Sequence, residues 1–134
     1  MAALVERAYA PWVPIIGRRP APMDDDYAAR CTAGQALLLD HEDGLAGLLV
    51  LVPAADHLWI DNVAIEPALA GQGLGRALMA EAEQEARRLG LPELRLLTHA
   101  LMASNIALYR RLGFIETTRR EEHGFSRVFM ARRL

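Results

Sequence analysis

The residues best suited to chemistry form a glycine-rich turn between an apolar segment and an amphipathic one. Glycine stands at positions 71, 73 and 75, after the Val- and Ile-containing segment 57–66 and before a segment of alternating apolar and charged character. Glycines let a backbone approach a ligand closely, and the first amides of a helix point outward without intrahelical partners at the positive end of its dipole. The turn therefore predicts a binding site for an anion.

The pattern of this turn differs from two familiar phosphate-binding turns. A P-loop follows its last glycine with Lys and then Ser or Thr, whereas Arg76 and Ala77 follow Gly75 here. A dinucleotide-binding turn needs the spacing Gly-x-Gly-x-x-Gly, which is also absent. A nucleotide-binding domain is therefore disfavoured. Tight packing of a helix against a strand is the alternative explanation for the glycines.

A second chemically capable pair, Asn105 and Tyr109, stands four residues apart in a segment with helical spacing. Residues at that separation lie on one face of a helix, so an amide and a phenol would project together. The phenol is protonated at neutral pH and is a proton donor. The alternatives are that Tyr109 fills space beside Leu112 and that Asn105 satisfies backbone groups where the helix begins.

Hydrophobic periodicity predicts the elements that position these residues. The clearest helix covers 72–89, where Leu and Ala recur at helical spacing. The other predicted helices are residues 2–9, a segment from Asp24 to about Thr32, and a segment capped by Ser104 and ended by Gly113. The predicted strands are residues 35–40, 44–53, 57–66, 94–98, 114–120 and 125–132.

Two connections carry their own signals. Asp43 and Gly44 end a short turn between two apolar runs, which indicates a β-hairpin. Residues 11–22 contain four prolines, and we expect an irregular loop there because each proline removes a donor and restricts the residue before it. The order of elements predicts a single mixed α/β domain over residues 1–134, built around one sheet.

The composition excludes several classes of protein. A chain of 134 residues with 52% hydrophobic and 24% charged residues fits one globular domain. A single cysteine, Cys31, excludes an internal disulfide and a cysteine-built metal site, and a net charge of −2 gives no electrostatic reason to expect nucleic acid. The longest apolar stretch, 44–55, is shorter than the ~18–20 residues that span a bilayer. We therefore expect a cytoplasmic protein with no membrane partner and no metal.

The two chemically capable segments resemble the signature motifs of the GNAT superfamily of N-acetyltransferases. Residues 63–67 and 71–78 are similar to its acetyl-CoA motif, residues 105–114 to its second motif, and residues 127–130 suit its last strand. The resemblance covers about residues 35–134. Of the amino-terminal helices, only their order matches the family. It implies the acyl-CoA N-acyltransferase fold, a central and mostly antiparallel sheet with a splayed strand pair flanked by helices.

The resemblance implies acetyl-CoA as the acyl donor. Its pyrophosphate would sit on the turn amides, and its pantetheine arm would lie along the preceding strand, whose edge is exposed where it splays from strand 94–98. The cofactor-binding residues that it implies are Val63, Ile65, Gly71, Gln72, Gly73, Gly75, Arg76 and Asn105. The motif departs from the family at Ala70, where Arg or Gln is usual, and we expect weaker cofactor binding as a result.

The resemblance also implies catalytic roles. Tyr109 corresponds to the general acid that protonates the departing thiolate. A primary amine near pKa 10 must lose a proton before it attacks. Strand alternation places Asp61 on one face with Trp59, Val63 and Ile65, so Asp61 is the first candidate for the base. The second candidate is His99. The alternatives are a solvated carboxylate for Asp61 and a polar loop residue for His99.

The acceptor side is less clear from the sequence. The proline-rich segment is expected to border the acceptor site, and the candidate substrate-binding residues are Trp12, Arg18, Arg19 and Tyr27. The two arginines would favour an acidic group on the acceptor, or they are solvated loop residues. Trp12 and Tyr27 would contact substrate, or they pack against the sheet.

The sequence therefore leads to an N-acetyltransferase that transfers acetyl from acetyl-CoA to the primary amine of a small molecule or peptide by direct attack. A non-catalytic acyl-CoA-binding or regulatory module with the same fold is the alternative. The family's first strand, ahead of the first helix, has no counterpart in the sequence and is either missing or precedes it. The sequence also leaves open a homodimer whose interface is the apolar last strand, 125–132.

Overall fold

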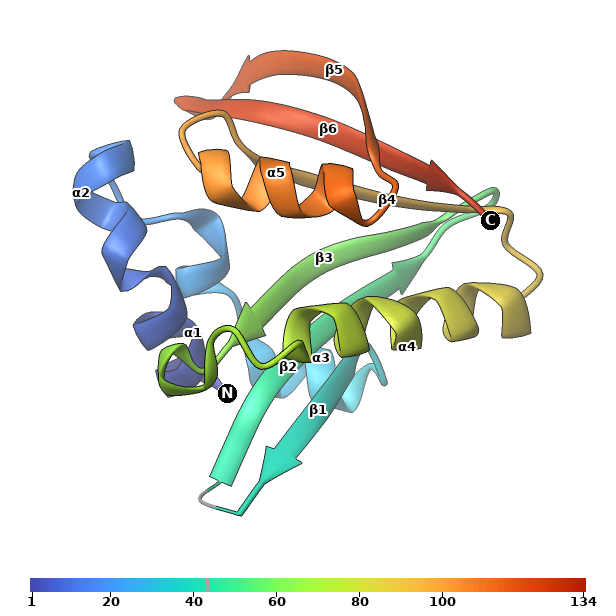
Figure 1. The fold of residues 1–134 in the computed structure, drawn as a ribbon, viewed down its shortest axis with the longest axis horizontal. Coiled ribbons are helices and arrows are strands. Elements are labelled where there is room, and N and C mark those ends of the chain that lie inside the picture. The colour runs from blue at the N-terminus through green and yellow to red at the C-terminus, as the bar shows by residue number, and fades with distance from the viewer. Residues whose placement is uncertain (43) are drawn as a thin grey trace.

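The computed structural model of the protein describes residues 1–42 and 44–134 and has a six-stranded sheet at its centre (Figure 1). Its strand order is β1-β2-β3-β4-β6-β5, and all neighbours are antiparallel except the parallel pair of β3 and β4. The strands are β1 (Ala36–His41), β2 (Gly44–Pro53), β3 (Leu58–Ile65), β4 (Glu93–His99), β5 (Ile115–Glu122) and β6 (Phe125–Arg133). The mixed α/β prediction and its six strands are confirmed.

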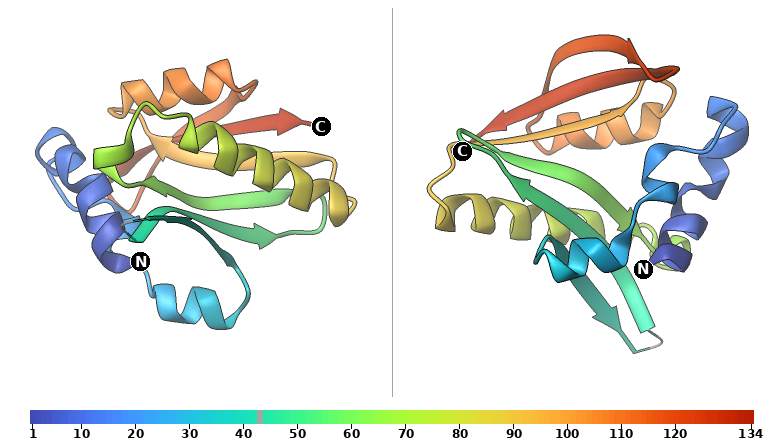
Figure 2. Two further views of the ribbon diagram at one scale, coloured as in Figure 1. Left: turned by 60° about the horizontal axis from the view of Figure 1, so that its bottom comes forward. Right: turned by 180° about the vertical axis from the view of Figure 1, so that it is seen from behind.

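Helices cover both faces of the sheet, with α4 and α3 on opposite sides (Figure 2). The α-helices are α1 (Ala2–Tyr9), α2 (Val13–Ile16), α3 (Tyr27–Thr32), α4 (Leu74–Arg88) and α5 (Ala103–Arg111). The 3-10 turns are η1 (Ala10–Trp12), η2 (Ala21–Asp24) and η3 (Pro67–Leu69). None of the helices in the described part of the chain has the length and apolarity that a bilayer crossing requires.

Residues 11–22 are mostly helical, so the prediction of an irregular loop is wrong. Each of η1, α2 and η2 carries a proline in its first two positions. A proline fits there because the first amides of a helix have no intrahelical partner, and its fixed φ already suits the helix. Three of the four prolines therefore start short helical turns instead of preventing them, and Pro20 directly precedes η2.

Two other local predictions need adjustment. Met102 precedes the first residue of α5, so Ser104 lies inside the first turn and is not its cap. Asp26 caps α3, since its carboxylate accepts a hydrogen bond of 3.0 Å from the amide of Ala29, and Asp24 belongs to η2. The pairing of β1 with β2 confirms the hairpin, although Asp43 in its turn lies outside the described residues.

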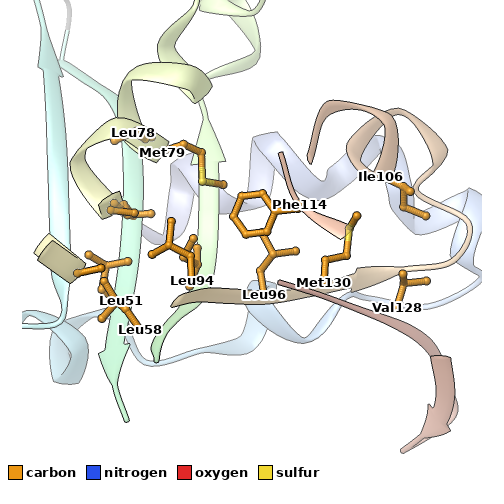
Figure 3. Close-up of a cluster of buried hydrophobic side chains, with 14 residues drawn as sticks. Leu51, Leu58, Leu78, Met79, Leu94, Leu96, Ile106, Phe114, Val128 and Met130 are labelled. Atoms are coloured by element: carbon orange, nitrogen blue, oxygen red, sulfur yellow. The ribbon is translucent and has the colours of Figure 1, made fainter. Parts of the chain in front are cut away.

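The larger hydrophobic core lies between the sheet and helices α4 and α5 (Figure 3). Leu78, Met79, Ala82 and Ala86 form the buried stripe of α4, as its helical spacing predicts. Buried residues from the strands, α5 and the chain just before β5 complete this core: Leu49, Leu51, Leu58, Ile60, Leu94, Leu96, Ile106, Phe114, Val128 and Met130. The core fixes α4 and α5 beside the diverging ends of β3 and β4.

The smaller core attaches the amino-terminal segment to the other face. Leu4 and Val5 from α1 pack with Tyr27 and with β2 and β3 residues. A chain of hydrogen bonds runs through this region, in which the Tyr9 hydroxyl donates to Asn62 Oδ1 (2.5 Å) and Asn62 Nδ2 donates to the Tyr27 hydroxyl (2.9 Å). The Tyr27 hydroxyl in turn donates to the carbonyl of Pro22. These bonds hold the amino-terminal segment against β3.

Strands β3 and β4 pair over only three residues each before they separate. The parallel register joins Leu58–Ile60 to Leu94–Leu96, and no pairing continues toward Ile65. Figure 1 shows the two strands diverging toward the end of β3 that leads into the glycine turn. The later half of β3 therefore has an open edge on its β4 side, as expected for a splayed pair.

A β-bulge at Asp61 changes which side chains share a face of β3. Val50 pairs with Asn62 and Leu51 with Ile60, so Asp61 is an extra residue in the ladder. The alternation shifts at that point. Ile60 and Val63 contact the larger core, whereas Ala64 belongs to the smaller one. The prediction that Trp59, Asp61, Val63 and Ile65 share one face is therefore wrong.

Candidate active site

The glycine turn presents a row of unpaired backbone amides. Gly71 and Gly73 have φ values of +82° and +77°, and Gly73 caps α4 in the left-handed region without any side-chain cap. Within the described chain, the amides of residues 71–76 donate no hydrogen bond to a backbone carbonyl. A Cβ added at Gly71, Gly73 or Gly75 would meet no atom within 4 Å. The glycines thus leave open space over the amides, which suits an anion better than close helix–strand packing.

A cavity that is open to solvent connects the start of α4 to the open edge of β3. Val63, Ile65 and Gly75 line one side of it, and Asn105 lines the other. The exposed Gln72 and Arg76 lie in and just beyond the turn. The cavity therefore brings together three of the predicted cofactor-binding residues on β3 and α4 with Asn105 on α5.

A second open cavity lies beside the first, and Tyr109 belongs to the wall of both. The other residues that line both cavities are Tyr9, Val63, Met102 and Asn105. This second cavity extends between the amino-terminal segment at Pro20–Pro22 and the β6 residues Phe125 and Arg127. We call the first the cofactor-side cavity and the second the acceptor-side cavity.

Tyr109 is held on α5 where the two cavities meet. Its ring packs edge-on against Phe114, with ring centroids 6.0 Å apart. Burial raises the pKa of its phenol to about 12, because the charged phenolate would lose solvation there. The hydroxyl is therefore protonated throughout the neutral range and can act as a proton donor. Its ring at the same time packs against the larger core, next to Phe114.

Asp61 reaches the acceptor-side cavity from the bulge and is bound to the protein through both oxygens. Its Oδ2 accepts from Arg30 of α3 (2.9 Å), and its Oδ1 accepts from the indole N–H of Trp59 (3.2 Å). A carboxylate oxygen has two lone pairs, so each oxygen keeps one acceptor position. Asp61 is thus a fixed carboxylate at the cavity, half-buried and ion-paired.

His99 also lines the acceptor-side cavity, but its ring is used in local structure. The backbone amides of Leu101 and Ser126 point at the two ring nitrogens, Nδ1 at 3.1 Å and Nε2 at 3.4 Å. A neutral imidazole accepts at one nitrogen only, and the shorter Leu101 contact favours Nδ1 as the acceptor and Nε2 as the protonated nitrogen. Burial lowers its pKa, and the nearby Glu121 opposes that shift. The ring packs edge-on against Phe125. The one ring nitrogen of neutral His99 that could accept a proton already accepts a hydrogen bond. His99 is therefore better suited to line the cavity than to act as a base.

The four candidate substrate-binding residues lie in different environments. Trp12 lines the cofactor-side cavity, not the acceptor side. Tyr27 is 4% exposed within the smaller core, and Arg19 pairs with Glu6 (2.8 Å) and Asp24 (3.2 Å), so neither reaches a cavity. Arg18 contacts Phe125, a residue of the acceptor-side cavity wall. Glu66, at the end of β3, pairs with Arg7 of α1 (2.6 Å).

Sequence reasoning missed several cavity residues. Tyr9 lines both cavities, while Asn62, Phe125 and Arg127 line the acceptor side. Asn62 had a signal, because it is a polar residue next to Asp61 in an otherwise apolar strand. The described residues contain no group of three or more His, Cys, Asp or Glu placed to hold a metal ion.

Comparison with known proteins finds acetyltransferases among both the curated relatives and the solved structures. The protein is 35% identical over 79 residues to the ribosomal protein bS18-alanine N-acetyltransferase of Escherichia coli K12, a match covering 59% of this chain and 53% of the relative. The chain thus spans about half the length of the curated relatives it matches. The crystal structure of the Escherichia coli ribosomal-protein-S18-alanine N-acetyltransferase superposes with a TM-score of 0.75 at 27% identity, over 98% of this chain and 85% of that one.

A second solved structure has the same fold at lower identity. It is a GNAT family acetyltransferase from Elizabethkingia anophelis with acetyl-CoA bound, with a TM-score of 0.67 and 18% identity over 86% of this chain and 92% of that one. The sequence model of the acetyltransferase (GNAT) family matches residues 2–114. That match covers most of the chain and includes the glycine turn, Asn105 and Tyr109. The protein therefore belongs to the GNAT family of acetyltransferases.

Proposed function

We propose that the protein transfers an acetyl group from acetyl-CoA to a primary amine by direct attack of the amine on the thioester. The observation that carries the proposal is the position of Tyr109 in the wall shared by two cavities, one of which begins at unpaired helix amides. In the reaction, the amine nitrogen forms a bond to the acetyl carbon as the carbon–sulfur bond breaks. Acetyl-CoA supplies the activated acyl group, and the protein supplies positions and proton donors.

Residues of β3 and α4 suit the donor. The amides of Gln72, Gly73, Gly75 and Arg76 would bind the pyrophosphate, and the open space over the three glycines fits its approach. The unpaired edge of β3 at Val63 and Ile65 would bind the pantetheine arm as an added strand. Asn105, whose side chain faces both cavities, would bind the same arm through its amide.

Tyr109 would protonate the thiolate as it leaves. A phenol with a pKa of about 12 holds its proton at neutral pH, so the donor form is the resting form. The departing thiolate would lie at the boundary of the two cavities, where the hydroxyl is placed. A module that only bound acyl-CoA would have no use for a proton donor at that boundary.

The amine must lose one proton, and Asp61 would accept it. Asp61 lines the acceptor-side cavity, each of its oxygens keeps one acceptor position, and Arg30 and Trp59 fix the carboxylate in place. The proton would move directly or through a water held by the carboxylate. His99 is the weaker candidate because Nδ1 already accepts the Leu101 amide.

The acceptor amine would belong to a small molecule or a peptide. Its route is the acceptor-side cavity between the amino-terminal segment and β6. A peptide amine is supported by the E. coli relative, whose name describes action on an alanine of a ribosomal protein.

A thiol-release assay with acetyl-CoA and a panel of primary amines, including a peptide that begins with alanine, tests the proposal. Free thiol should appear only when an acceptor is present. Tyr109→Phe should lower kcat by about ten- to a thousand-fold while acetyl-CoA affinity, measured by calorimetry, changes little. Tight acetyl-CoA binding without thiol release for any amine would instead identify a non-catalytic binding module. Unchanged kcat in Tyr109→Phe would remove Tyr109 from the mechanism.

A further inference from the structure

Arg18 connects the two walls of the acceptor-side cavity on its solvent side. Its guanidinium lies 4.2 Å from the centre of the Phe125 ring, and its Nη1 donates a hydrogen bond to the carbonyl of His123 (3.0 Å). Phe125 is 9% exposed while Arg18 is exposed, so the arginine covers the ring from outside. Figures 1 and 2 both show α2, which ends just before Arg18, beside the turn between β5 and β6.

The hairpin turn is shaped to accept this side chain. His123 has a φ of +51°, unusual for a residue with a Cβ, and the next residue, Gly124, has a φ of +80°. A Cβ at Gly124 would come within 2.3 Å of Arg18 Nη1. The glycine therefore leaves the space that the guanidinium fills, and the strained turn directs the His123 carbonyl toward it.

The contact is weak enough to open. One hydrogen bond to a neutral carbonyl and one cation–π contact at an exposed site are each small contributions. In the part of the chain that the structure describes, Arg18 has no carboxylate partner, whereas its neighbour Arg19 has two, Glu6 and Asp24. The more strongly bound arginine stabilises the amino-terminal segment itself, and the weakly bound one only bridges to the hairpin.

We propose that Arg18 is a specificity-determining residue that restricts the acceptor-side cavity to small amines. The inference rests on the proposed function. With Arg18 in place, the amino-terminal segment and the β5–β6 hairpin are joined over Phe125, so an acceptor with a long substituent must break that contact. A small amine fits inside the closed cavity and does not have to break it. Arg18 therefore acts on the selection of the acceptor and not on the chemical step.

Arg18→Ala tests this inference with two acceptors of different size, alaninamide and a hexapeptide that begins with alanine. The ratio of kcat/KM for the hexapeptide to kcat/KM for alaninamide should rise by about tenfold, mainly through a lower KM for the peptide. The affinity for acetyl-CoA should stay the same, since Arg18 lines neither cavity. An unchanged ratio would overturn the inference. A fall in kcat/KM for both acceptors would also overturn it, because Arg18 would then bind the acceptor.

Two further variants make the test specific. Arg19→Ala removes the same charge one residue away from an arginine that does not reach the hairpin, and it should leave the ratio unchanged. Gly124→Ala keeps Arg18, but the added methyl group occupies the space of its guanidinium and displaces it from the turn. The ratio should therefore rise as it does with Arg18→Ala. A rise with Arg19→Ala equal to that with Arg18→Ala would attribute the effect to charge alone and overturn the inference.

Failure of the proposed function is distinguishable from failure of this inference. If the unmodified protein acetylates neither these two acceptors nor any other amine of the panel, the proposed function fails, and hydrogen exchange then tests the contact itself. Amides of the turn between β5 and β6 should exchange faster in Arg18→Ala than in Arg19→Ala. Equal exchange in the two variants would show that Arg18 does not hold the hairpin and would overturn the inference without any activity measurement.

Discussion

The two cavities that meet at Tyr109 are built by different means. The binding groups proposed for the cofactor side are mostly backbone groups of the glycine turn and the open edge of β3, which are continuous in sequence, while side chains of α1, η1, α4 and α5 complete the cavity wall. The acceptor side is made from side chains that come from α1, α2, η2, β3, β4, α5 and β6 and that are far apart in the sequence. A backbone site tolerates most side-chain changes but depends on its glycines. A side-chain site depends on the polar contacts that hold its walls.

The largest effect should come from closing the backbone site. Gly73→Val would place a branched side chain in the open space over the turn amides and would strain a backbone at φ +77°. We expect acetyl-CoA affinity to fall by at least a hundredfold, about 3 kcal/mol. Isothermal titration calorimetry with acetyl-CoA and with CoA would measure it.

Gly34→Val is the matched control for backbone strain. Gly34 has a φ of +70°, has no atom within 4 Å of an added Cβ, and lies far from the turn at the end of α3. Both variants should therefore lose similar stability on thermal unfolding, and only Gly73→Val should lose affinity. Equal affinity in the two variants would mean that the pyrophosphate site lies elsewhere.

A smaller effect should come from the polar chain that holds the acceptor side. Asn62→Ala removes the group that accepts from Tyr9 and donates to Tyr27. Two buried hydroxyl groups then lose a partner, and the free energy of unfolding should fall by about 1–3 kcal/mol. The KM for the acceptor should rise more than the KM for acetyl-CoA, because the bond network positions Tyr9 and Pro22 on the acceptor-side wall.

Thr98→Val provides the comparison within the same region. Thr98 and Asn62 are the two buried polar residues of the described chain, but the Thr98 hydroxyl contacts only the sulfur of Met102 at 3.7 Å. Its loss should change the unfolding free energy by less than about 1 kcal/mol, since a thioether is a weak acceptor. A similar fall in unfolding free energy in both variants would mean that the hydrogen bonds of Asn62 contribute no stability beyond the packing of its side chain.

The contrast between the cavities also explains what could be predicted from sequence. The glycine turn, the helix after it and the pair Asn105 and Tyr109 are local patterns, and the amphipathic spacing of α4 fixes its buried stripe. The splayed β3–β4 pair followed from the family resemblance and is confirmed. These features need only a short window of sequence, so they were recognisable without knowing the packing.

The acceptor side depended on packing that no short window contains. The bulge at Asp61 shifted the faces of β3, and its only trace is two adjacent polar residues, Asp61 and Asn62, in an apolar strand. Tyr27 and Arg19 were candidates for substrate contact, but the smaller core and two carboxylates use them instead. Proline spacing could not distinguish a loop from short helical turns, because proline suits the first position of either.

The smallest effect should come from the titration of His99 on the acceptor-side wall. Burial lowers its pKa below the ordinary value of 6.5, so below pH 6.5 the unfolded chain binds a proton that the folded protein still excludes. The stability contributed by neutral His99 is therefore present above pH 6.5 and is lost as the pH falls through the lowered pKa. Glu121 favours the charged ring and makes the loss smaller.

His99→Asn isolates this contribution, because the Asn side-chain oxygen can accept the Leu101 amide in place of Nδ1 without titrating. Between pH 7.5 and 5.5, the urea midpoint of the unmodified protein should fall more than that of His99→Asn, while His41→Asn, at the exposed end of β1, should follow the unmodified protein. Parallel midpoints for the unmodified protein and His99→Asn would mean that charging the ring costs the fold nothing. The β4 end of the acceptor-side wall would then be as solvated as the unfolded chain. The polar contacts of the amino-terminal segment would in that case be the one feature that distinguishes this wall from the cofactor side, where the proposed binding groups are mostly backbone groups.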